Sequence, residues 1–249
     1  MERIILIETS TALCSVALAE DGVIVDYRES SAPKAHASLT AVFIQEMIAE
    51  RGLSVTDCNA VCVSMGPGSY TGLRVGVSTA KGLCFGAKVP LIAVGTLDTL
   101  VAQAGLRLAP PVQNADKEGT SVMSGEAGTS AGYKYIVPMI DARRMEVYTA
   151  VFTPNGKQIT ETAPMIIDEN SFADILADGP VLFIGDGAGK CADAIKHPNA
   201  HFCQCHPKAS SMLFPALTEF RSGNFCDVAY FEPFYLKEFV ATVSKKKLF

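Results

Sequence analysis

The sequence of 249 residues lacks any continuous apolar stretch of about eighteen residues, the length that a membrane-spanning helix needs. The apolar run that follows Met1-Glu2-Arg3 is only four residues long, which is too short for a secretory signal peptide. Charged residues make up only 19% of the chain and hydrophobic residues 49%, so the chain can bury a sizeable core. This composition excludes a disordered or fibrous protein.

An excess of positive charge is also missing. Lysine and arginine number 21 against 26 aspartate and glutamate residues, which gives a formal net charge of −5. Binding to the phosphates of a nucleic acid depends on clustered positive charge, so the chain alone is expected to bind RNA weakly. The only basic run, the lysines at 245–247, is interpreted as a solvated tail.

The eight cysteines show no regular spacing that would indicate a disulfide framework. Two of them, Cys14 and Cys62, lie in apolar runs typical of strands, where cysteine behaves as a small hydrophobic residue. Unpaired cysteines are typical of a reducing compartment. The sequence therefore predicts a reduced, cytoplasmic protein.

Groups for metal-dependent or nucleophilic chemistry are few. His201, Cys203, Cys205 and His206 form a cluster, but a zinc site needs a second pair of ligands at a distance. Structural cysteines are the preferred interpretation, and metal binding by Cys203, Cys205 and His206 stays open. With four histidines in the chain, no Ser-His-Asp arrangement can be assembled, which argues against a peptidase.

The chain does contain one pattern of strands and helices twice. The first copy opens with a buried strand that ends at Glu8, followed by a hairpin through Asp21-Gly22, a strong turn signal between apolar runs. In the second copy a strand ends at Asp141, and the corresponding turn is Asn155-Gly156. Expected strands cover residues 4–7, 14–19, 23–28, 60–65, 91–94, 135–140, 146–152 and 181–184, and expected helices cover 36–51, 70–86 and a segment opened by Thr96.

This repetition predicts an α/β fold made of two facing βββαβα units. The first unit spans residues 1–106 and is completed by the C-terminal segment 220–249, and the second unit spans 134–219. Residues 107–133 are rich in proline, glycine, serine and threonine and are expected to form a flexible insertion between the units. The aromatic-rich segment 230–239 is expected to pack on the first unit.

A glycine-rich string at residues 66–76 joins a strand to a helix. It lacks the lysine of a Walker loop, and Thr71 stands where a Rossmann fingerprint needs glycine. Ser69 lacks the flanking glycines of a nucleophile elbow. Free N–H groups at such a junction could bind an anion, and a tight turn that only needs glycines explains the string equally well.

The helix after this string carries small residues at two sets of positions. Gly72, Gly76 and Ala80 lie four residues apart, and Gly82 and Gly86 form another stripe. Each glycine in a helix interior lowers helix stability by about 0.8–1 kcal/mol relative to alanine, which usually has a packing reason. The ridge at 72–80 predicts close approach of another backbone, either the helix at 36–51 or a helix of another chain. In the second case, Gly76→Leu should weaken association while the monomer stays folded.

Glu8 and Asp141 end equivalent strands, so the duplication places them on opposite walls of one cleft. In ATP-binding proteins of this architecture, acidic residues at these points handle Mg²⁺ and the attacking water. Gly185-Asp186-Gly187-Ala188 stands where such proteins pass backbone under the adenosine. The candidate nucleotide-binding residues are therefore Glu8, Ser10, Asp141, Gly185 and Gly187, and strand-end caps or remnants of the duplication are the alternative.

Several segments occur together as they do in one bacterial family. They are Glu8-Thr9-Ser10-Thr11, Cys14-Ser15-Val16-Ala17, the string at 66–76, the segment 141–148 and Pro233-Phe-Tyr-Leu. The string is the most specific, because it is long and matches no general nucleotide-binding loop. Through these segments the chain resembles the TsaB (YeaZ) family over nearly its whole length, except for residues 107–133. The resemblance implies the actin/Hsp70/sugar-kinase-like (ASKHA) fold.

The same resemblance implies a role in making threonylcarbamoyladenosine on tRNA. Such proteins are non-catalytic partners of a TsaD-type transferase, which a TsaE-type ATPase joins, and they form homodimers when alone. The chain would then contact tRNA only indirectly and would need no membrane and no cofactor. The helices at 36–51 and 70–86 would form the interface, with Leu39, Phe43, Met47, Gly72, Leu73, Gly76 and Ala80 as candidate interface residues.

Two positions depart from the patterns of these families. A TsaD-like metal site uses His-x3-His on the helix that begins here at His36, and the second position is Thr40, so a catalytic metal is not expected. Glu8 stands where the family usually has aspartate, which lowers the expectation of ATP hydrolysis. A scaffold without catalytic residues is therefore the leading hypothesis. The alternatives are an ATPase or phosphotransferase, weak ATP or ADP binding alone, and a glycoprotease-type peptidase.

Overall fold

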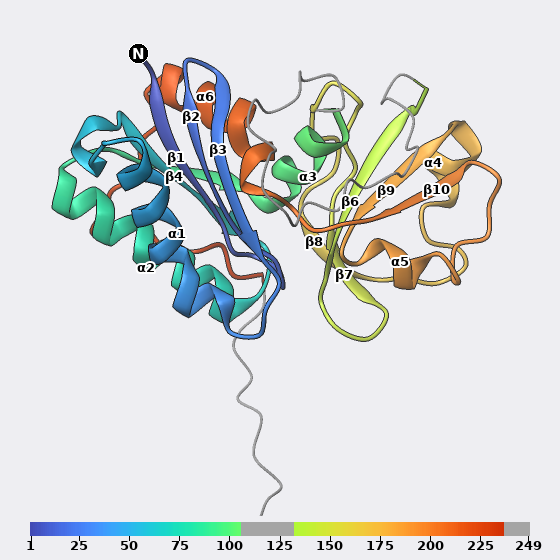
Figure 1. The fold of residues 1–249 in the computed structure, drawn as a ribbon. Helices are drawn as coiled ribbons and strands as arrows, with labels where there is room; N and C mark the ends of the chain where they lie inside the picture. Colours follow the sequence, from blue (N-terminus) through green and yellow to red (C-terminus); the bar gives the residue numbers. More distant parts are fainter. Residues whose placement is uncertain (106–131, 237–249) are drawn as a thin grey trace, which may run out of the picture.

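The computed structural model describes residues 1–105 and 132–236, which form two lobes, each built on a five-stranded sheet (Figure 1). The predicted duplication is confirmed, and each copy continues past βββαβα to a fifth strand. Within the described ranges, no helix has the length and apolar character needed to cross a membrane.

The first lobe has the strand order β3-β2-β1-β4-β5. β1 pairs antiparallel with β2 and parallel with β4, so it lies at the centre of the sheet. A central strand is buried on both faces and is therefore apolar throughout, as Ile4, Ile5 and Leu6 are. The elements are β1 (Arg3–Glu8), β2 (Cys14–Glu20), β3 (Val23–Ser30), α1 (Ala35–Glu50), η1 (Val55–Asp57), β4 (Ala60–Gly66), α2 (Tyr70–Ala87) and β5 (Leu91–Gly95).

Two sets of helices cover the two faces of this sheet. Helices α1 and α2 contribute Met47 and Val77 to the hydrophobic cluster on one face. On the other face lie η3 (Ala209–Met212) and α6 (Leu213–Ser222), whose Met212 and Leu217 pack against β1 and its neighbours (Figure 1). Helix α2 connects β4 to β5, because two parallel strands can be joined only by a crossover connection.

The second lobe has the order β10-β9-β6-β7-β8 and repeats the first lobe's antiparallel and parallel pairings. The expected strand at 146–152 is shorter, because the chain leaves β7 at Thr149 and Phe152 pairs separately with Ile136 and Gln158. The elements are β6 (Tyr135–Asp141), β7 (Glu146–Thr149), β8 (Ala163–Ile166), α4 (Ala173–Asp178), β9 (Val181–Gly185), α5 (Ala188–Cys191) and β10 (Ala200–Gln204).

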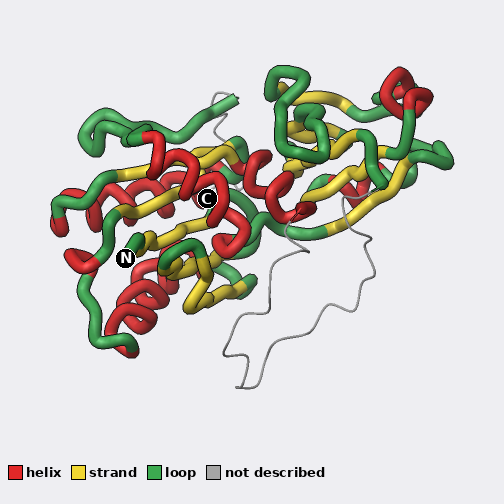
Figure 2. The backbone as a smooth tube through the Cα atoms, turned by 90° about the horizontal axis from the view of Figure 1, so that it is seen from above, coloured by secondary structure: helices red, strands yellow, loops and turns green. Residues whose placement is uncertain are grey.

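Helix α3 (Thr96–Gly105) lies at the junction of the lobes, as the view from above shows (Figure 2). Its Leu97 and Leu100 share a buried cluster with Ile136 and Ile140 of β6. Gln103 accepts hydrogen bonds from Lys208 N and Ser211 Oγ, both at 3.1 Å. Helix α3 therefore binds residues 208–211, where the chain passes from the second lobe back to the first.

The boundary of the second unit differs from the expected end at residue 219. The chain already belongs to the first lobe from Ala209, because η3 and α6 bury their apolar side chains against its sheet. Apolar packing, which local composition does not reveal, decides this boundary. The expected insertion at 107–133 lies outside the described residues except for its last two positions.

The segment after α6 packs on the first lobe, as expected for the described part of 230–239. Phe234 N donates to Met65 O at 2.7 Å, and Lys81 Nζ donates to the carbonyls of Ala229 and Phe231 at 3.1 and 3.0 Å. Further back, Cys226 N donates to Leu91 O at 2.8 Å. These bonds attach the segment along β4, α2 and β5.

Candidate functional site

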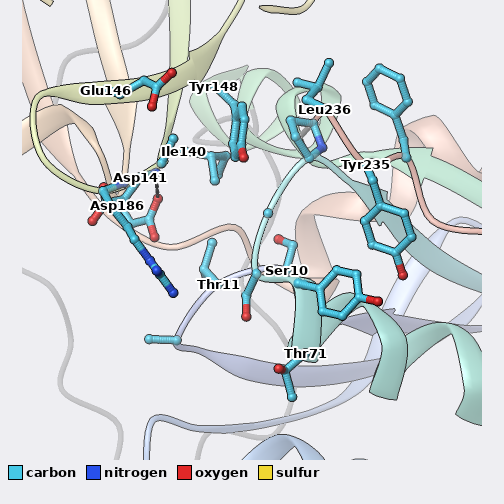
Figure 3. Close-up of a pocket in the computed structure, with 18 of the residues that line it drawn as sticks. Ser10, Thr11, Thr71, Ile140, Asp141, Glu146, Tyr148, Asp186, Tyr235 and Leu236 are labelled. Atoms are coloured by element: carbon cyan, nitrogen blue, oxygen red, sulfur yellow. Dashed lines mark hydrogen bonds between the residues drawn. The ribbon is translucent and has the colours of Figure 1, made fainter. Parts of the chain in front are cut away.

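A cleft of about 850 Å³ lies between the lobes (Figure 3). Its walls come from the loop after β1, the turn before α2, the loop between β6 and β7, and the segment that ends at Leu236. Labelled residues from the two lobes, such as Ser10 and Tyr148, face each other across it (Figure 3). The duplication therefore produces the predicted cleft.

The glycine-rich string lines the first-lobe side of the cleft, where it packs against the loop after β1. Ser69 is the N-cap of α2, and its Oγ accepts from Gly72 N at 3.3 Å. Ser69 N donates to Ser10 O at 2.6 Å, and a Cβ at Gly68 would lie 2.3 Å from that same oxygen. Glycine is thus required at position 68 because the two backbones touch there.

Glu8 does not reach the cleft, which corrects the prediction that it forms one of the walls. Its side chain is fully buried beneath the cleft, and its Oε1 accepts from Ser10 N at 2.7 Å. Burial raises the pKa of Glu8, against the smaller opposite effects of hydrogen bonds from Ser10 and Ser64. A carboxyl group that is buried away from the cleft is poorly placed to bind Mg²⁺ there.

Asp141 does line the cleft, at the end of β6. Its Oδ1 accepts from Arg143 N at 2.7 Å and pairs with the ammonium group of Lys190. The carboxylate therefore closes a turn and balances a neighbouring cation. Glu8 and Asp141 end equivalent strands, but they do not act together on one ligand.

Of the string Gly185-Asp186-Gly187-Ala188, only Asp186 lines the cleft. A Cβ at Gly185 would lie 2.2 Å from Met139 O, and one at Gly187 would lie 2.8 Å from Val147 Cγ1. Both glycines therefore serve close packing of this turn against β6 and β7. Neither glycine lines the cleft, and their place under an adenosine stays a prediction; of the candidate nucleotide-binding residues, Ser10 and Asp141 line the cleft.

Sequence reasoning missed the aromatic and basic residues of the cleft. The rings of Tyr70 and Tyr235 meet with centroids 4.9 Å apart, although their positions are distant in the sequence. Arg143 and Arg144 follow β6 in a left-handed turn with φ of 73° and 51°. Tyr70, Tyr235 and the arginine pair all stand in segments that carry the family resemblance, and this was the available signal. Arginines beside a helix N-terminus suit an anion better than a metal ion.

The histidine that begins the expected metal motif has a structural partner. His36 Nε2 lies 2.8 Å from Thr11 O, and Thr40 Oγ1 donates to His36 O at 2.6 Å. Thr40 is buried, and Cys14 Sγ lies 3.3 Å from its hydroxyl. Thr40 therefore fills an interior position of α1 in place of a second metal-ligating histidine.

The histidines and cysteines at 201–206 have different neighbours and do not form one site. A hydrogen bond with Cys203 raises the pKa of Cys205, and burial raises it further. His206 Nδ1 instead lies 3.1 Å from Thr11 Oγ1 of the first lobe, and the ring of His201 meets that of Tyr133. Among the residues the structure describes, no three side chains of metal-ligating type come together.

The small-residue ridge on α2 does permit a close approach, but the partner is a strand of the same chain. A Cβ at Gly72 would lie 2.1 Å from Thr9 O, and one at Gly76 would lie 2.2 Å from Thr9 Oγ1. Thr9 Oγ1 donates to Gly72 O at 2.9 Å. The expectation of a partner helix is wrong for Gly72 and Gly76, because α2 passes over the end of β1 there, whereas Ala80 shares a buried cluster with Ile44 and Met47 of α1.

This packing also changes the candidate interface. Gly72, Leu73, Gly76, Ala80 and Met47 are buried within the first lobe, so a partner cannot reach them without disturbing its core. Leu39 and Phe43 of α1 are half-buried and stay accessible. An interface on these helices can therefore use Leu39 and Phe43, together with exposed neighbours.

The outer face of α1 and α2 offers such residues. Gly82 and Gly86 are exposed, and a Cβ at either position would meet nothing within 4 Å. Phe85 beside them is 81% exposed, and Val42 of α1 is 39% exposed. We call this surface the outer helix face, and it consists of Ala37, Ser38, Ala41, Val42, Gln45, Ser78, Gly82, Phe85 and Gly86.

Comparisons with known proteins agree with this geometry. Residues 29–115 match the family described as "TsaD: tRNA N6-adenosine threonylcarbamoyltransferase". The chain is 32% identical to the tRNA threonylcarbamoyladenosine biosynthesis protein TsaB of Escherichia coli, over 96% of each chain. It is 30% identical to the protein of the same name from Bacillus subtilis, over 73% of this chain and 70% of that one.

A solved structure shows the same fold. "YeaZ from Pseudomonas aeruginosa" superposes with a TM-score of 0.76 at 22% identity, covering 95% of this chain and 100% of that one. Both predictions, the duplicated α/β fold and the family resemblance, are therefore confirmed. The chain belongs to the TsaB family of tRNA threonylcarbamoyladenosine biosynthesis proteins.

Proposed function

We propose that the chain is a non-catalytic subunit that binds and supports a TsaD-type transferase during threonylcarbamoyladenosine formation on tRNA. A TsaE-type ATPase joins this assembly, and the chain forms a homodimer when it is alone. Its site of action is the cytoplasm, which its free cysteines suit. With a net charge of −5, it leaves most of the tRNA contact to its partners.

The observation that carries this proposal is the outer helix face. Gly82 lowers the stability of α2 by about 0.8–1 kcal/mol relative to alanine, and no contact with a described residue requires glycine at 82 or at 86. Glycines that face outward let the backbone of a second helix come close. A partner helix packed against this face would explain the presence of both glycines in α2.

Phe85 gives the same face an apolar anchor. It is 81% exposed next to the two glycines, and burying a phenylalanine side chain contributes about 1.5–3 kcal/mol. Glu46 of α1 and Arg74 of α2 are exposed one turn from Val42 and Ser78, so a partner seated on this face would meet charged groups at its edge. A TsaD-type transferase and a second copy would both use this face.

The cleft supports a role without catalysis. Glu8 is buried with a raised pKa, and Asp141 is paired with Lys190. Neither is placed as a Mg²⁺ ligand, so we propose no ATPase or phosphotransferase activity and no required cofactor. If this is correct, Glu8→Ala and Asp141→Ala leave tRNA modification intact in a system reconstituted with TsaD-type and TsaE-type proteins, apart from any loss of folded Glu8→Ala protein. Removing a true catalytic carboxylate would lower the rate by orders of magnitude.

Gly82→Leu tests the interface directly. The substitution raises helix propensity and meets open space, so the monomer should keep its melting temperature. Overpacking a helix interface costs about 1–3 kcal/mol, and about 1.4 kcal/mol corresponds to tenfold in affinity. Sedimentation should therefore show self-association and TsaD binding weakened by roughly ten- to a hundredfold.

The control is Ala177→Leu, which also introduces a leucine at an exposed helix position, on α4 of the second lobe. It should leave both associations unchanged. Full association of the Gly82→Leu protein would place the interface elsewhere and remove the main support for the scaffold.

A further inference from the structure

A second large hollow lies on the opposite side of the first lobe from the outer helix face. It has a volume of about 1300 Å³ and runs between α6, α3, the hairpin at 22–24 and the turn at 154–156. We call it the α6 groove. The cleft, the outer helix face and the segment after α6 use other parts of the chain.

The walls of the α6 groove are largely apolar. Phe214 of α6 is 53% exposed and Val23 of the hairpin is 55% exposed, although both are large hydrophobic residues. Val94 and Val101 form its deeper walls, and Pro154 of the second lobe closes one end. A surface of this kind favours the apolar side chains of a ligand or partner.

The charged residues that line the groove are both acidic, Asp98 of α3 and Glu219 of α6. Neither forms an ion pair with another described residue. Glu219 Oε2 accepts from the Asn224 side chain at 2.9 Å. Partial removal from water raises the pKa of Asp98, and the nearby charge of Glu219 raises it further.

Asp98 has a local role as well, because it lies in the first turn of α3, where a carboxylate stabilises the helix. That role does not involve Glu219, which lies on a different helix. Two carboxylates on neighbouring helices repel each other unless a cation lies between them. The groove therefore provides apolar walls and a place for one positive charge.

We propose that the α6 groove is a docking site for a protein segment that presents a lysine or arginine between apolar side chains. The cation lies between Asp98 and Glu219, and the neighbouring apolar side chains contact Phe214 and Val23. Because this groove and the outer helix face lie on opposite sides of one sheet, both can be occupied at once. The proposal does not depend on the proposed function.

The probe is a short fluorescein-labelled peptide in which leucine and lysine alternate, and fluorescence anisotropy measures its binding to the full chain. A peptide with glutamate in place of lysine is the charge control. The lysine peptide should bind, and the glutamate peptide should not. Binding should also weaken as the pH falls and the two carboxylates become protonated.

Two protein variants locate the binding. The double variant Asp98→Asn, Glu219→Gln keeps the shapes of the side chains and should weaken binding roughly fivefold or more. Phe214→Ser should weaken it without changing the carboxylates. Glu169→Gln neutralises an exposed acid on the second lobe and should have no effect.

Any of three results would overturn the proposal. They are no binding of the lysine peptide to the natural chain, equal binding of the glutamate peptide, or unchanged binding to both groove variants. Phe214→Ser keeps the test decisive if the loss of Asp98 unfolds α3. Because Gly82→Leu reports on the other face of the sheet, failure here leaves the proposed function standing.

Discussion

Helix α2 carries two pairs of glycines with the same four-residue spacing and opposite surroundings. Gly72 and Gly76 face the end of β1 so closely that a Cβ would lie within 2.2 Å of an oxygen of Thr9. Gly82 and Gly86 face outward, and a Cβ on either would meet nothing within 4 Å. The fold of the chain therefore explains the first pair, and the second pair is the part of α2 to which the proposed function assigns a partner. The four-residue spacing of glycines therefore indicates a smooth helix face but does not show which backbone packs against it.

The largest expected effect comes from enlarging the inner pair. Gly76→Leu places a side chain where Thr9 and Val63 already lie, so the helix must leave the sheet or the strand must shift. Substitutions of this kind destabilise a protein by about 3 kcal/mol or more. Denaturant unfolding should show this loss, in contrast to the unchanged melting expected for Gly82→Leu.

This expectation replaces the one drawn from the ridge alone, in which the Gly76→Leu monomer stays stable. Gly76→Ala is a useful intermediate step, because its Cβ already comes within 2.2 Å of Thr9 Oγ1. A stable Gly76→Leu protein would mean that α2 does not pack on β1 as described.

A smaller effect is expected at Phe85, which extends the outer side of the comparison. Phe85→Ala removes a side chain that is 81% exposed in the monomer, so the free energy of unfolding of the isolated chain should change by less than about 0.5 kcal/mol. Association should weaken by about tenfold or more, because an aromatic anchor at an interface often contributes at least 1–2 kcal/mol. Isothermal titration with a TsaD-type protein measures this, and an unchanged affinity would place Phe85 outside the interface.

The smallest effect concerns Glu8, whose buried side chain lies at the end of β1, on the opposite face of the sheet from α2. Burial raises the pKa of Glu8 in the folded state above its ordinary value of 4.5, so between these two pKa values the folded state holds a proton that the unfolded state releases. Its contribution to stability is full below pH 4.5 and is lost as the pH rises toward the folded pKa. Glu8→Gln should therefore unfold less readily than the natural chain at neutral pH, and the difference should disappear below pH 4.5.

Unfolding curves recorded across the pH range for both proteins test this expectation. Asp141→Asn is the control, because Asp141 ends the equivalent strand but is half exposed and paired with Lys190. If the natural chain became more stable as the pH rises and the Glu8→Gln protein did not, Glu8 would be buried as a carboxylate.

Much of the fold could be predicted from the sequence, because its signals are local. The turn Asp21-Gly22, with φ of 47° and 81°, joins β2 and β3 as its composition indicates. The expected helix at 70–86 corresponds to α2 at Tyr70–Ala87, and its N-cap Ser69 is part of the string that predicted the junction. The duplication and its cleft followed from matching Glu8 with Asp141.

The errors lie where distant segments meet. The ridge at Gly72 and Gly76 was assigned to a helix because sequence spacing shows a smooth face but not its neighbour. The sequence also does not show that Glu8 is buried beneath the cleft rather than part of its wall. The unit boundary at 219 was placed too late, because α6 reveals its place only through the core it shares with the first sheet.

The sequence by itself determined the elements, the twofold repeat and the family, since apolar period, turn residues and motifs are properties of short segments. The tertiary structure decided which side of α2 is inside, that Glu8 is sealed beneath the cleft, and that Asp98 and Glu219 share one groove. These facts depend on which surfaces meet when the crossover helices fold back on their sheets. Protein interiors are close-packed, so the neighbours of a buried residue are known only when the whole fold is assembled.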